Sequence, residues 1–442
     1  MKIIEYNESI WPALKKRLEK DAFPPDKLES VRKIVQAVRE RGDAAVREFT
    51  LRFDGVKPAS FRVAPAAIRS ARKVVTPELK NVFRRVEKNI RDFSSLTRAT
   101  SWRKGRGDGL IWGEQVTPVG RAGIYIPGGK APLVSSVFMT VIPARLAGVP
   151  RIILATPPRG DGTISPYIAA AADFLGVTEI YAIGGAQAIA AMAFGTRSIP
   201  RVDKIVGPGN IYVTLAKKMV FGYVGIDSLA GPSEVAILAD GKASARYIAA
   251  DLLAQAEHGA GGISILVTPS KRLIEAVARE ADALAARRGR AAILRRALQA
   301  GVSLVRVKSL SEGIELINRI APEHLEIMTA DPVKTLKKVR NAGAIFIGDL
   351  SPVAAGDYIS GPSHVLPTGG SARFASLLSA NDFLKKSSLI RYNRGALKND
   401  LPAIELIAGL EGLDAHALSA RVRLGKNRAN PKKAESRAIC LI

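Results

Sequence analysis

The chain has 442 residues, of which 47% are hydrophobic, and this content excludes a disordered protein and allows large buried cores. No apolar run reaches the roughly 18 residues of a membrane-spanning helix, and a single cysteine excludes intrachain disulfides. The net charge of +26 predicts fast capture of anions. Because basic residues are spread along the chain without interleaved aromatics, nucleic-acid binding stays open only as a nonspecific electrostatic association. We expect a cytoplasmic location, because the N-terminal segment lacks a signal peptide's apolar core.

Residues 26–49 and 77–97 each have the apolar spacing of an amphipathic helix. After a stretch rich in glycine and proline, apolar strands alternate with helices. The expected strands read "AGIYIP", "RIILAT", "EIYAIG" and "VDKIVG". The expected helices cover 133–148, 164–175, 186–194 and 210–221. Continuous apolar strands separated by helices are typical of a parallel, doubly wound sheet.

The alternation restarts after "AGPSE". "VAILA" and "ISILVT" flank a helix at 242–257, and "SLVRV" and "AIFIG" flank a helix at 309–319. After residue 380 the strand signals stop, and the chain reads as helical and then basic. We predict an α/β fold of two doubly wound, incomplete Rossmann-like domains with parallel sheets, plus small helical N- and C-terminal segments.

Glycine turns follow three of the expected strands, in "YIPGG", at Gly184–Gly185 and in "VGPGN". Such a turn lets backbone N–H groups at a helix start meet an anion. Turns at the carboxyl ends of strands in one open sheet should line a crevice. One turn alone is best explained by tight packing, whereas three together favour a ligand site. A P-loop and a standard G-x-G-x-x-G dinucleotide fingerprint are both absent.

The chain has only four histidines, and three of them have polar neighbours in the sequence that could share a metal ion. These neighbours pair up as Gln255 with His258, Asp357 with His364, and Glu411 with His416. Only the first pair shares a helix face, since its members are three residues apart. Nitrogen and carboxylate ligands suit a divalent ion such as zinc. Spacing alone leaves a metal site and ordinary structural histidines equally open.

The fourth histidine, His324, follows Glu323 in "IAPEHLEIMT". The pair has the composition of a general acid–base unit, because an imidazole titrates near neutral pH. The alternative is a carboxylate at a helix start followed by a half-buried histidine. The residues by themselves favour this structural alternative.

These motifs together resemble the histidinol dehydrogenase family along nearly the whole chain. The matching stretches occur in the family's order and spacing. They read "GIYIPGGKAPLVSSVFMTVIPARLAGV", "GGAQAIAAMAFGT", "VDKIVGPGNIYV", "AGPSEVAILAD", "DLLAQAEH", "APEHLE", "GAIFIGD", "GPSHVLPT", "ARF" and "EGLDAH".

The resemblance implies a role for each candidate residue. The positions matching ligands of one Zn²⁺ per subunit are Gln255, His258, Asp357 and His416. The positions matching the catalytic acid–base pair are Glu323 and His324. Besides the metal ligands and His324, the positions matching substrate contacts are Ser233, His364 and Glu411. The positions matching NAD contacts lie in or beside the glycine turns and are Tyr125, Gln187 and Asn210.

The resemblance also implies an activity, the oxidation of L-histidinol to L-histidine through L-histidinal with two NAD⁺, the last step of histidine biosynthesis. It implies a homodimer with exchanged C-terminal segments. Gly259, Val353 and Ser363 depart from the residues common at their positions, which leaves open a related zinc- and NAD-dependent dehydrogenase of another polar alcohol.

The domain boundaries that we expect divide the chain into four parts. They are an N-terminal helical arm (1–25), a discontinuous first Rossmann-like domain that carries most zinc and catalytic residues (26–124 and 234–378), an NAD-binding second Rossmann-like domain (125–233), and a C-terminal helical dimerisation segment with a basic tail (379–442).

Overall fold

The structure is a computed structural model that describes residues 1–18, 24–128, 132–257, 262–286 and 298–425. The chain divides into two compact units, one of residues 1–98 with 118–384 and the other of residues 99–117 with the chain from Lys385 onward. Among the helices of the described ranges, none is long and apolar enough to cross a membrane.

A five-stranded parallel sheet in the first unit has the order β6-β5-β4-β7-β8. Its strands are β4 (Arg121–Tyr125), β5 (Arg151–Thr156), β6 (Glu179–Ala182), β7 (Lys204–Val206) and β8 (Gly225–Ile226). Numbered along the chain, this order is 3-2-1-4-5, that of a Rossmann sheet without its last strand. The predicted doubly wound parallel sheet is therefore confirmed.

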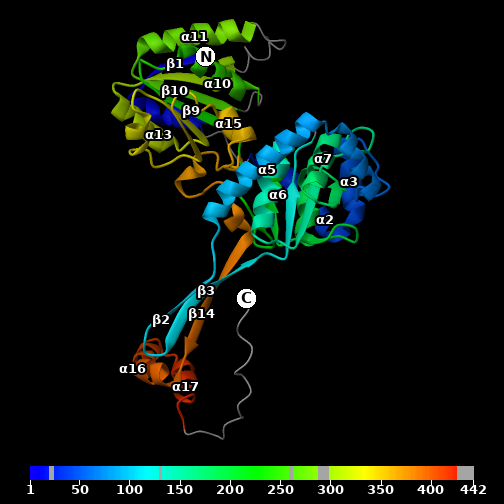
Figure 1. Cartoon of the computed structure of the whole chain (residues 1–442), viewed down its shortest axis with the longest axis vertical. Helices are drawn as coiled ribbons and strands as arrows, with labels where there is room; N and C mark the ends of the chain where they lie inside the picture. The colour runs from blue at the N-terminus through cyan, green and yellow to red at the C-terminus, as the bar shows by residue number, and fades with distance from the viewer. Residues whose placement is uncertain (19–23, 129–131, 258–261, 287–297, 426–442) are drawn as a thin grey trace. The chain divides into compact units, whose positions relative to one another are not determined.

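Helices cover both faces of this sheet, and each face has its own apolar core (Figure 1). One core contains α5 (Pro77–Thr97), α6 (Val134–Leu146) and α7 (Pro166–Phe174). The other contains α2 (Pro25–Arg41), α3 (Asp43–Asp54), α8 (Gly185–Phe194) and α9 (Ile211–Val220). The short helix α4 (Pro65–Ser70) packs on α7. We expected residues 26–124 to form one domain with residues 234–378. The helices of residues 26–124, however, pack around the five-stranded sheet.

A six-stranded parallel sheet follows, with the order β1-β11-β10-β9-β12-β13. Its strands are β1 (Lys2–Glu5), β9 (Glu234–Ala239), β10 (Ile263–Thr268), β11 (Val302–Arg306), β12 (His324–Met328) and β13 (Ala344–Ile347). Strands β9 to β13 repeat the order 3-2-1-4-5, and β1 adds an edge. The associated helices are α1 (Trp11–Leu18), α10 (Ala245–Ala256), α11 (Lys271–Ala286), α13 (Leu310–Ile320), α14 (Pro332–Leu336) and α15 (Val353–Tyr358). Figure 1 shows α10 and α11 beside β9 and β10.

The second unit contains a three-stranded sheet of order β14-β3-β2 and two helices. Its elements are β2 (Trp102–Gly105), β3 (Leu110–Pro118), β14 (Leu384–Tyr392), α16 (Arg394–Leu410) and α17 (Asp414–Arg421). Arg106 joins the sheet region to α16 through Asp400, with an N–O distance of 2.9 Å. The expectation that strands stop after residue 380 is therefore wrong. Most of β14 is exposed, so it lacks the buried alternating face that would have marked it.

Two other local predictions also fail. The single helix expected at 26–49 is broken at Gly42, whose φ of 53° no continuous right-handed helix allows. The region around Glu323 forms no helix start, because β12 begins at His324, and all five residues of this strand are buried. Glu326 interrupts the apolar run of β12, so no continuous apolar pattern marks this strand.

Candidate active site

Glu323 and His324 lie at the amino end of β12, where the chain leaves α13. The helix ends at Ala321, whose φ of 52° makes it the one non-glycine residue with positive φ in the part of the chain that the structure describes. Pro322 follows and cannot continue a helix. His324 pairs in register with Val235 of β9, the first strand of the sheet along the chain after β1. The turn therefore places both candidate side chains beside the central strand β9.

The main chain of one residue, Glu234, holds both members of this pair. Its N–H donates a hydrogen bond to Oε2 of Glu323 at 2.7 Å. Its carbonyl oxygen lies 2.9 Å from Nδ1 of His324. Because a carbonyl only accepts, Nδ1 carries a hydrogen, and in the neutral ring Nε2 is then the basic nitrogen. The backbone thus selects the tautomer of His324.

Nε2 of His324 is buried and has no hydrogen-bond partner. The nearest carboxylate is Asp357 on α15, whose Oδ1 is 3.6 Å away. Burial lowers the pKa of the His324 imidazole, but the nearby carboxylates of Glu323 and Asp357 together raise that pKa well above its usual value. The imidazole is thus a strong base in a site sheltered from water, and Nε2 accepts a proton once the ring is in its neutral form.

His364 lies next to this group and is held at both ring nitrogens. Its Nδ1 donates to the carbonyl oxygen of Asp357 at 2.9 Å. Its Nε2 lies 3.0 Å from the hydroxyl of Ser136, which then donates to it. Burial lowers the pKa of His364, so its ring is neutral at physiological pH. The hydrogen bond from His364 fixes the peptide of Asp357. The contact with Ser136 was not predicted from the sequence.

The predicted zinc ligands are only partly placed by the structure. Gln255 lies in the last turn of α10, is 4% exposed, and has a buried Nε2 without a hydrogen-bond partner. A half-turn of its amide would present the oxygen instead, which is a suitable ligand atom. His258 lies outside the described residues, and His416 is on α17 in the second unit. Within the described ranges, no group of three or more His, Cys, Asp or Glu side chains could hold a metal ion.

The surroundings of Gln255 and Asp357 nevertheless fit a cation. Topology puts the carboxyl end of α10 at the amino end of the six-stranded sheet, and the negative end of a helix dipole favours positive charge. An unsatisfied buried amide and a carboxylate supply oxygen donors there. The described donors therefore fit a zinc site that other residues would have to complete.

A buried carboxyl pair lies behind these residues and was not predicted. Glu326 of β12 is 1% exposed, and its Oε1 accepts a hydrogen bond of 3.0 Å from the N–H of Val353, the first residue of α15. Burial and the charge of Asp251 on α10 raise the pKa of Glu326, and the two side chains interact directly. The pair connects the helices that carry Gln255 and Asp357. No sequence motif pointed to it.

The remaining predicted substrate contacts lie in different places. Ser233 immediately precedes β9 and is next to Glu234, so it is near the amino end of the six-stranded sheet. Glu411 caps the end of α16, and both it and His416 are exposed within the second unit.

The described residues of the three glycine turns lie at the carboxyl ends of β4, β6 and β7, as predicted, although β5 separates β6 from β4. Gly129 of the first turn lies outside the described residues. The hydroxyl of Tyr125 accepts a hydrogen bond of 3.1 Å from the N–H of Gly185. Gly207 has a φ of 119°, and a Cβ there would lie 2.1 Å from the carbonyl oxygen of Tyr125. Only glycine allows this contact between neighbouring turns.

The side chains at this edge include unsatisfied polar groups. Gln187 is 1% exposed, and neither atom of its amide has a hydrogen-bond partner. A buried amide without partners is costly unless a ligand supplies them. Asn210 caps α9 by accepting hydrogen bonds from Tyr212 and Val213, which orients the positive end of that helix toward the turn. The edge therefore fits a polar, anionic ligand such as a dinucleotide.

Asp54, which no motif indicated, adds a carboxylate to the surroundings of Tyr125. Its Oδ2 is buried without a partner, and burial raises the pKa of Asp54 to about 6. Burial, together with the charge of Asp54, raises the pKa of Tyr125 to about 12. The phenol therefore stays protonated and can donate a hydrogen bond.

Known proteins resemble this chain over nearly its whole length. The family model of histidinol dehydrogenase matches residues 18–424. A histidinol dehydrogenase of Geobacillus kaustophilus (strain HTA426) is 49% identical over 393 residues, which cover 89% of this chain and 93% of that protein. One from Halalkalibacterium halodurans is 46% identical over 429 residues, covering 97% of this chain and 100% of that protein. The crystal structure of histidinol dehydrogenase from Elizabethkingia anophelis has a TM-score of 0.91 at 36% identity, covering 96% of this chain and 98% of that one.

Proposed function

Because the chain belongs to the histidinol dehydrogenase family, we propose that it oxidises L-histidinol to L-histidine through L-histidinal with two NAD⁺, the last step of histidine biosynthesis. The observation that carries this proposal is the buried pair of Glu323 and His324. Both are held by the main chain of Glu234, and Nε2 of His324 is left free beside Asp357.

In the first oxidation, Nε2 of His324 accepts the hydroxyl proton of the alcohol as hydride leaves its carbon. In the second, the carboxylate of Glu323 takes a proton from the water that adds to the aldehyde, and His324 again accepts a proton as hydride leaves the hydrate. Two successive oxidations at one carbon need two proton acceptors, and the adjacent side chains supply them.

The residues that would hold zinc are Gln255, His258, Asp357 and His416. When bound, zinc would grip the imidazole and amino nitrogens of the substrate and orient its carbinol group. Orientation of this kind accounts for about 7–11 kcal/mol of a barrier in favourable cases. Ser233, His364 and Glu411 would contact the polar ends of the substrate.

NAD would bind at the carboxyl edge of the five-stranded sheet. The buried amide of Gln187 would gain hydrogen-bond partners there. The hydroxyl of Tyr125 would donate to the cofactor, and the helix start at Asn210 would face its phosphates.

We further propose a cytoplasmic homodimer in which the C-terminal segment of one chain completes the partner's site with His416 and Glu411. Exposed apolar residues on this segment supply a surface for the dimer, namely Leu406, Ile407, Leu410, Leu418 and Val422. A monomer with full activity would contradict the exchange.

The experiment that tests the function is NADH release from L-histidinol by the purified protein, with and without a chelator. We expect two NADH per histidine formed and loss of activity when the chelator removes zinc, restored by added zinc. Activity with another polar alcohol and none with L-histidinol would favour the related dehydrogenase instead.

A further inference from the structure

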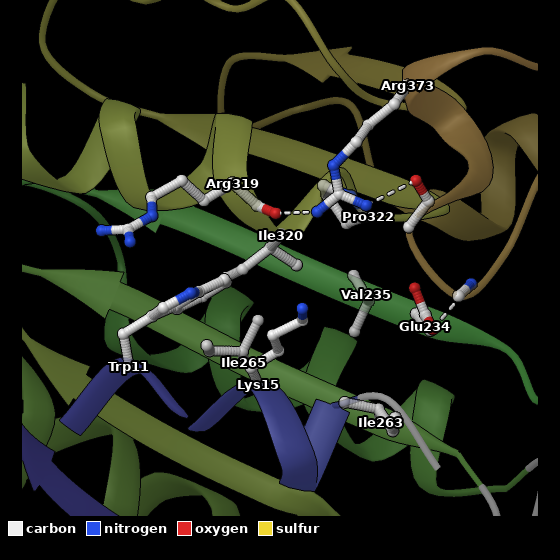
Figure 2. Close-up of a pocket in the computed structure, with 12 residues that line it drawn as sticks. Trp11, Lys15, Glu234, Val235, Ile263, Ile265, Arg319, Ile320, Pro322 and Arg373 are labelled. Carbon is white, nitrogen blue, oxygen red and sulfur yellow. Dashed lines mark hydrogen bonds between the residues drawn. The ribbon is translucent and has the colours of Figure 1, made fainter. Parts of the chain in front are cut away.

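The side chain of Glu234 faces a small cavity on the surface of the first unit. The cavity has a volume of about 20 Å³, enough for one or two water molecules. Figure 2 shows Glu234 on one side of it and Trp11 on the other, with the cationic side chains of Lys15, Arg319 and Arg373 around it. Ile263, Ile265 and Ile320 supply its apolar wall.

Glu234 connects this cavity to the proposed catalytic pair. Its main chain contacts Glu323 and His324 at 2.7 and 2.9 Å. Its carboxylate accepts a hydrogen bond of 3.0 Å from the N–H of Gly369 and lines the cavity. Glu234 thus contacts the pair with its main chain and the cavity with its side chain, and the charge of Glu323 acts on that side chain.

The proposed reaction releases protons that must leave this buried pair. One alcohol, two NAD⁺ and one water give one carboxylate, two NADH and three protons. The side chains of Glu323 and His324 are only 7% and 5% exposed, so they cannot pass protons freely to bulk water.

The environment of Glu234 suits a group that binds and releases protons near neutral pH. Burial and the charge of Glu323 raise the pKa of Glu234 to about 7, while backbone N–H groups of Gly369 and Glu323 and the charge of His324 act in the opposite direction. A carboxyl group with such a pKa exchanges protons efficiently at physiological pH. The cations around the cavity disfavour a proton staying there.

We propose that Glu234 relays protons from Glu323 to water in this cavity. Glu323 in its acid form gives its proton to the carboxylate of Glu234, which then gives it to a water molecule. Only O–H bonds are broken and formed, and Glu323 returns to the carboxylate that the next water activation requires. The inference rests on the proposed function, because the protons come from that reaction. Glu234 acts through Glu323 and is a positioning residue.

The test variant is Glu234→Gln. Its amide oxygen can still accept from Gly369, and its main chain still holds Glu323 and His324, but it carries no exchangeable acid proton. Glu234→Asp keeps an acid. The matched control is Glu312→Gln, because Glu312 also accepts a backbone hydrogen bond, from Lys308, but lies on the exposed part of α13.

Zinc-loaded, full-length proteins are compared with L-histidinol and NAD⁺. We expect kcat of Glu234→Gln to fall at least about tenfold with KM unchanged. Its solvent deuterium isotope effect should rise, its kcat–pH profile should lose the group titrating near pH 7, and acetate buffer should restore part of kcat. Glu234→Asp should keep more activity than the amide, and Glu312→Gln should match the wild type.

Wild-type kcat, isotope effect and pH profile in Glu234→Gln would overturn the relay. So would a fall in kcat with unchanged isotope effect and no rescue by acetate, because a purely structural role predicts that result. Zinc content and thermal unfolding of each variant identify a folding defect. If Glu234→Gln is misfolded, the kcat, isotope effect and pH profile of Glu234→Asp test the relay instead. If the wild type itself releases no NADH from L-histidinol, the proposed function fails first.

Discussion

The two parallel sheets share one strand order but use opposite ends. The five-stranded sheet gathers Tyr125, Gln187 and Asn210 at the carboxyl ends of its strands, where helices begin. The six-stranded sheet gathers Glu323 and His324 at the amino ends, where helices finish. Helix starts favour anions, and helix ends favour cations and protonated groups. The same topology therefore provides one edge suited to a dinucleotide and another suited to proton transfer and a metal ion.

The largest effect should come from the amino-end site. His324→Ala removes Nε2, the nitrogen that we propose accepts the alcohol proton, so kcat should fall by about 1,000-fold, within the range for general bases. Zinc content should stay at the wild-type level. Stopped-flow NADH release and metal analysis check both. Turnover within tenfold of the wild type would show that His324 is not the base.

At the carboxyl-end site, Gly207→Ala should cost at least about 3 kcal/mol of unfolding free energy, through overpacking and a disfavoured backbone conformation. A Cβ would meet the carbonyl of Tyr125 at 2.1 Å, with φ at 119°. Gly222→Ala is the control, because its φ is 100° and its Cβ would meet nothing within 4 Å. Chemical denaturation measures both free energies of unfolding. Equal losses of stability for the two variants would show that the cost comes from backbone strain alone and not from the contact with Tyr125.

Gln187→Met should separate binding from stability. The buried amide has no partner, so an apolar side chain of similar length should stabilise the free protein by about 1–2 kcal/mol. KM for NAD⁺ should rise about tenfold, since about 1.4 kcal/mol of hydrogen bonding is lost. Denaturant titration and steady-state kinetics measure the two quantities. An unchanged KM would place the cofactor away from Gln187.

The last effect concerns the pH dependence of stability and the pair of Glu326 and Asp251. The native pKa of Glu326 lies above its unfolded value, so between these two values the folded state binds more protons, and stability falls as pH rises. Glu326→Gln removes this titration. Between about pH 5 and pH 8, its free energy of unfolding should therefore fall by about 2 kcal/mol less than that of the wild type. Urea unfolding at several pH values measures the slope. A variant with the wild-type slope would show that Glu326 does not titrate in this range.

Continuous apolar runs made most of both sheets predictable. β5 and β10 are buried along nearly all of their length, and such strands leave a clear signal. β12 and β14 gave no such signal, because Glu326 interrupts one and exposed lysines fill the other. Pairing with distant strands decides these segments, and local sequence does not report it.

The candidate site divides in the same way. Glu323 and His324 stood out in the sequence as a candidate acid–base pair, but only the family resemblance favoured that role over a structural one. Ser136, Asp54 and Glu234 did not stand out, because each acts through residues far away in the chain, at separations that only folding brings together. No spacing rule links Glu234 to residues about 90 positions later.

Peptide atoms of Glu234 contact both proposed catalytic side chains, so among ordinary substitutions at this position proline alone removes the N–H donor. Every other substitution would change the carboxyl group and keep the backbone contacts to Glu323 and His324. An ester bond in place of the amide between Ser233 and Glu234, introduced by chemical ligation, would erase the N–H donor alone. A more mobile Glu323 carboxylate in that backbone analogue would show how far the main chain positions the side chains of this enzyme.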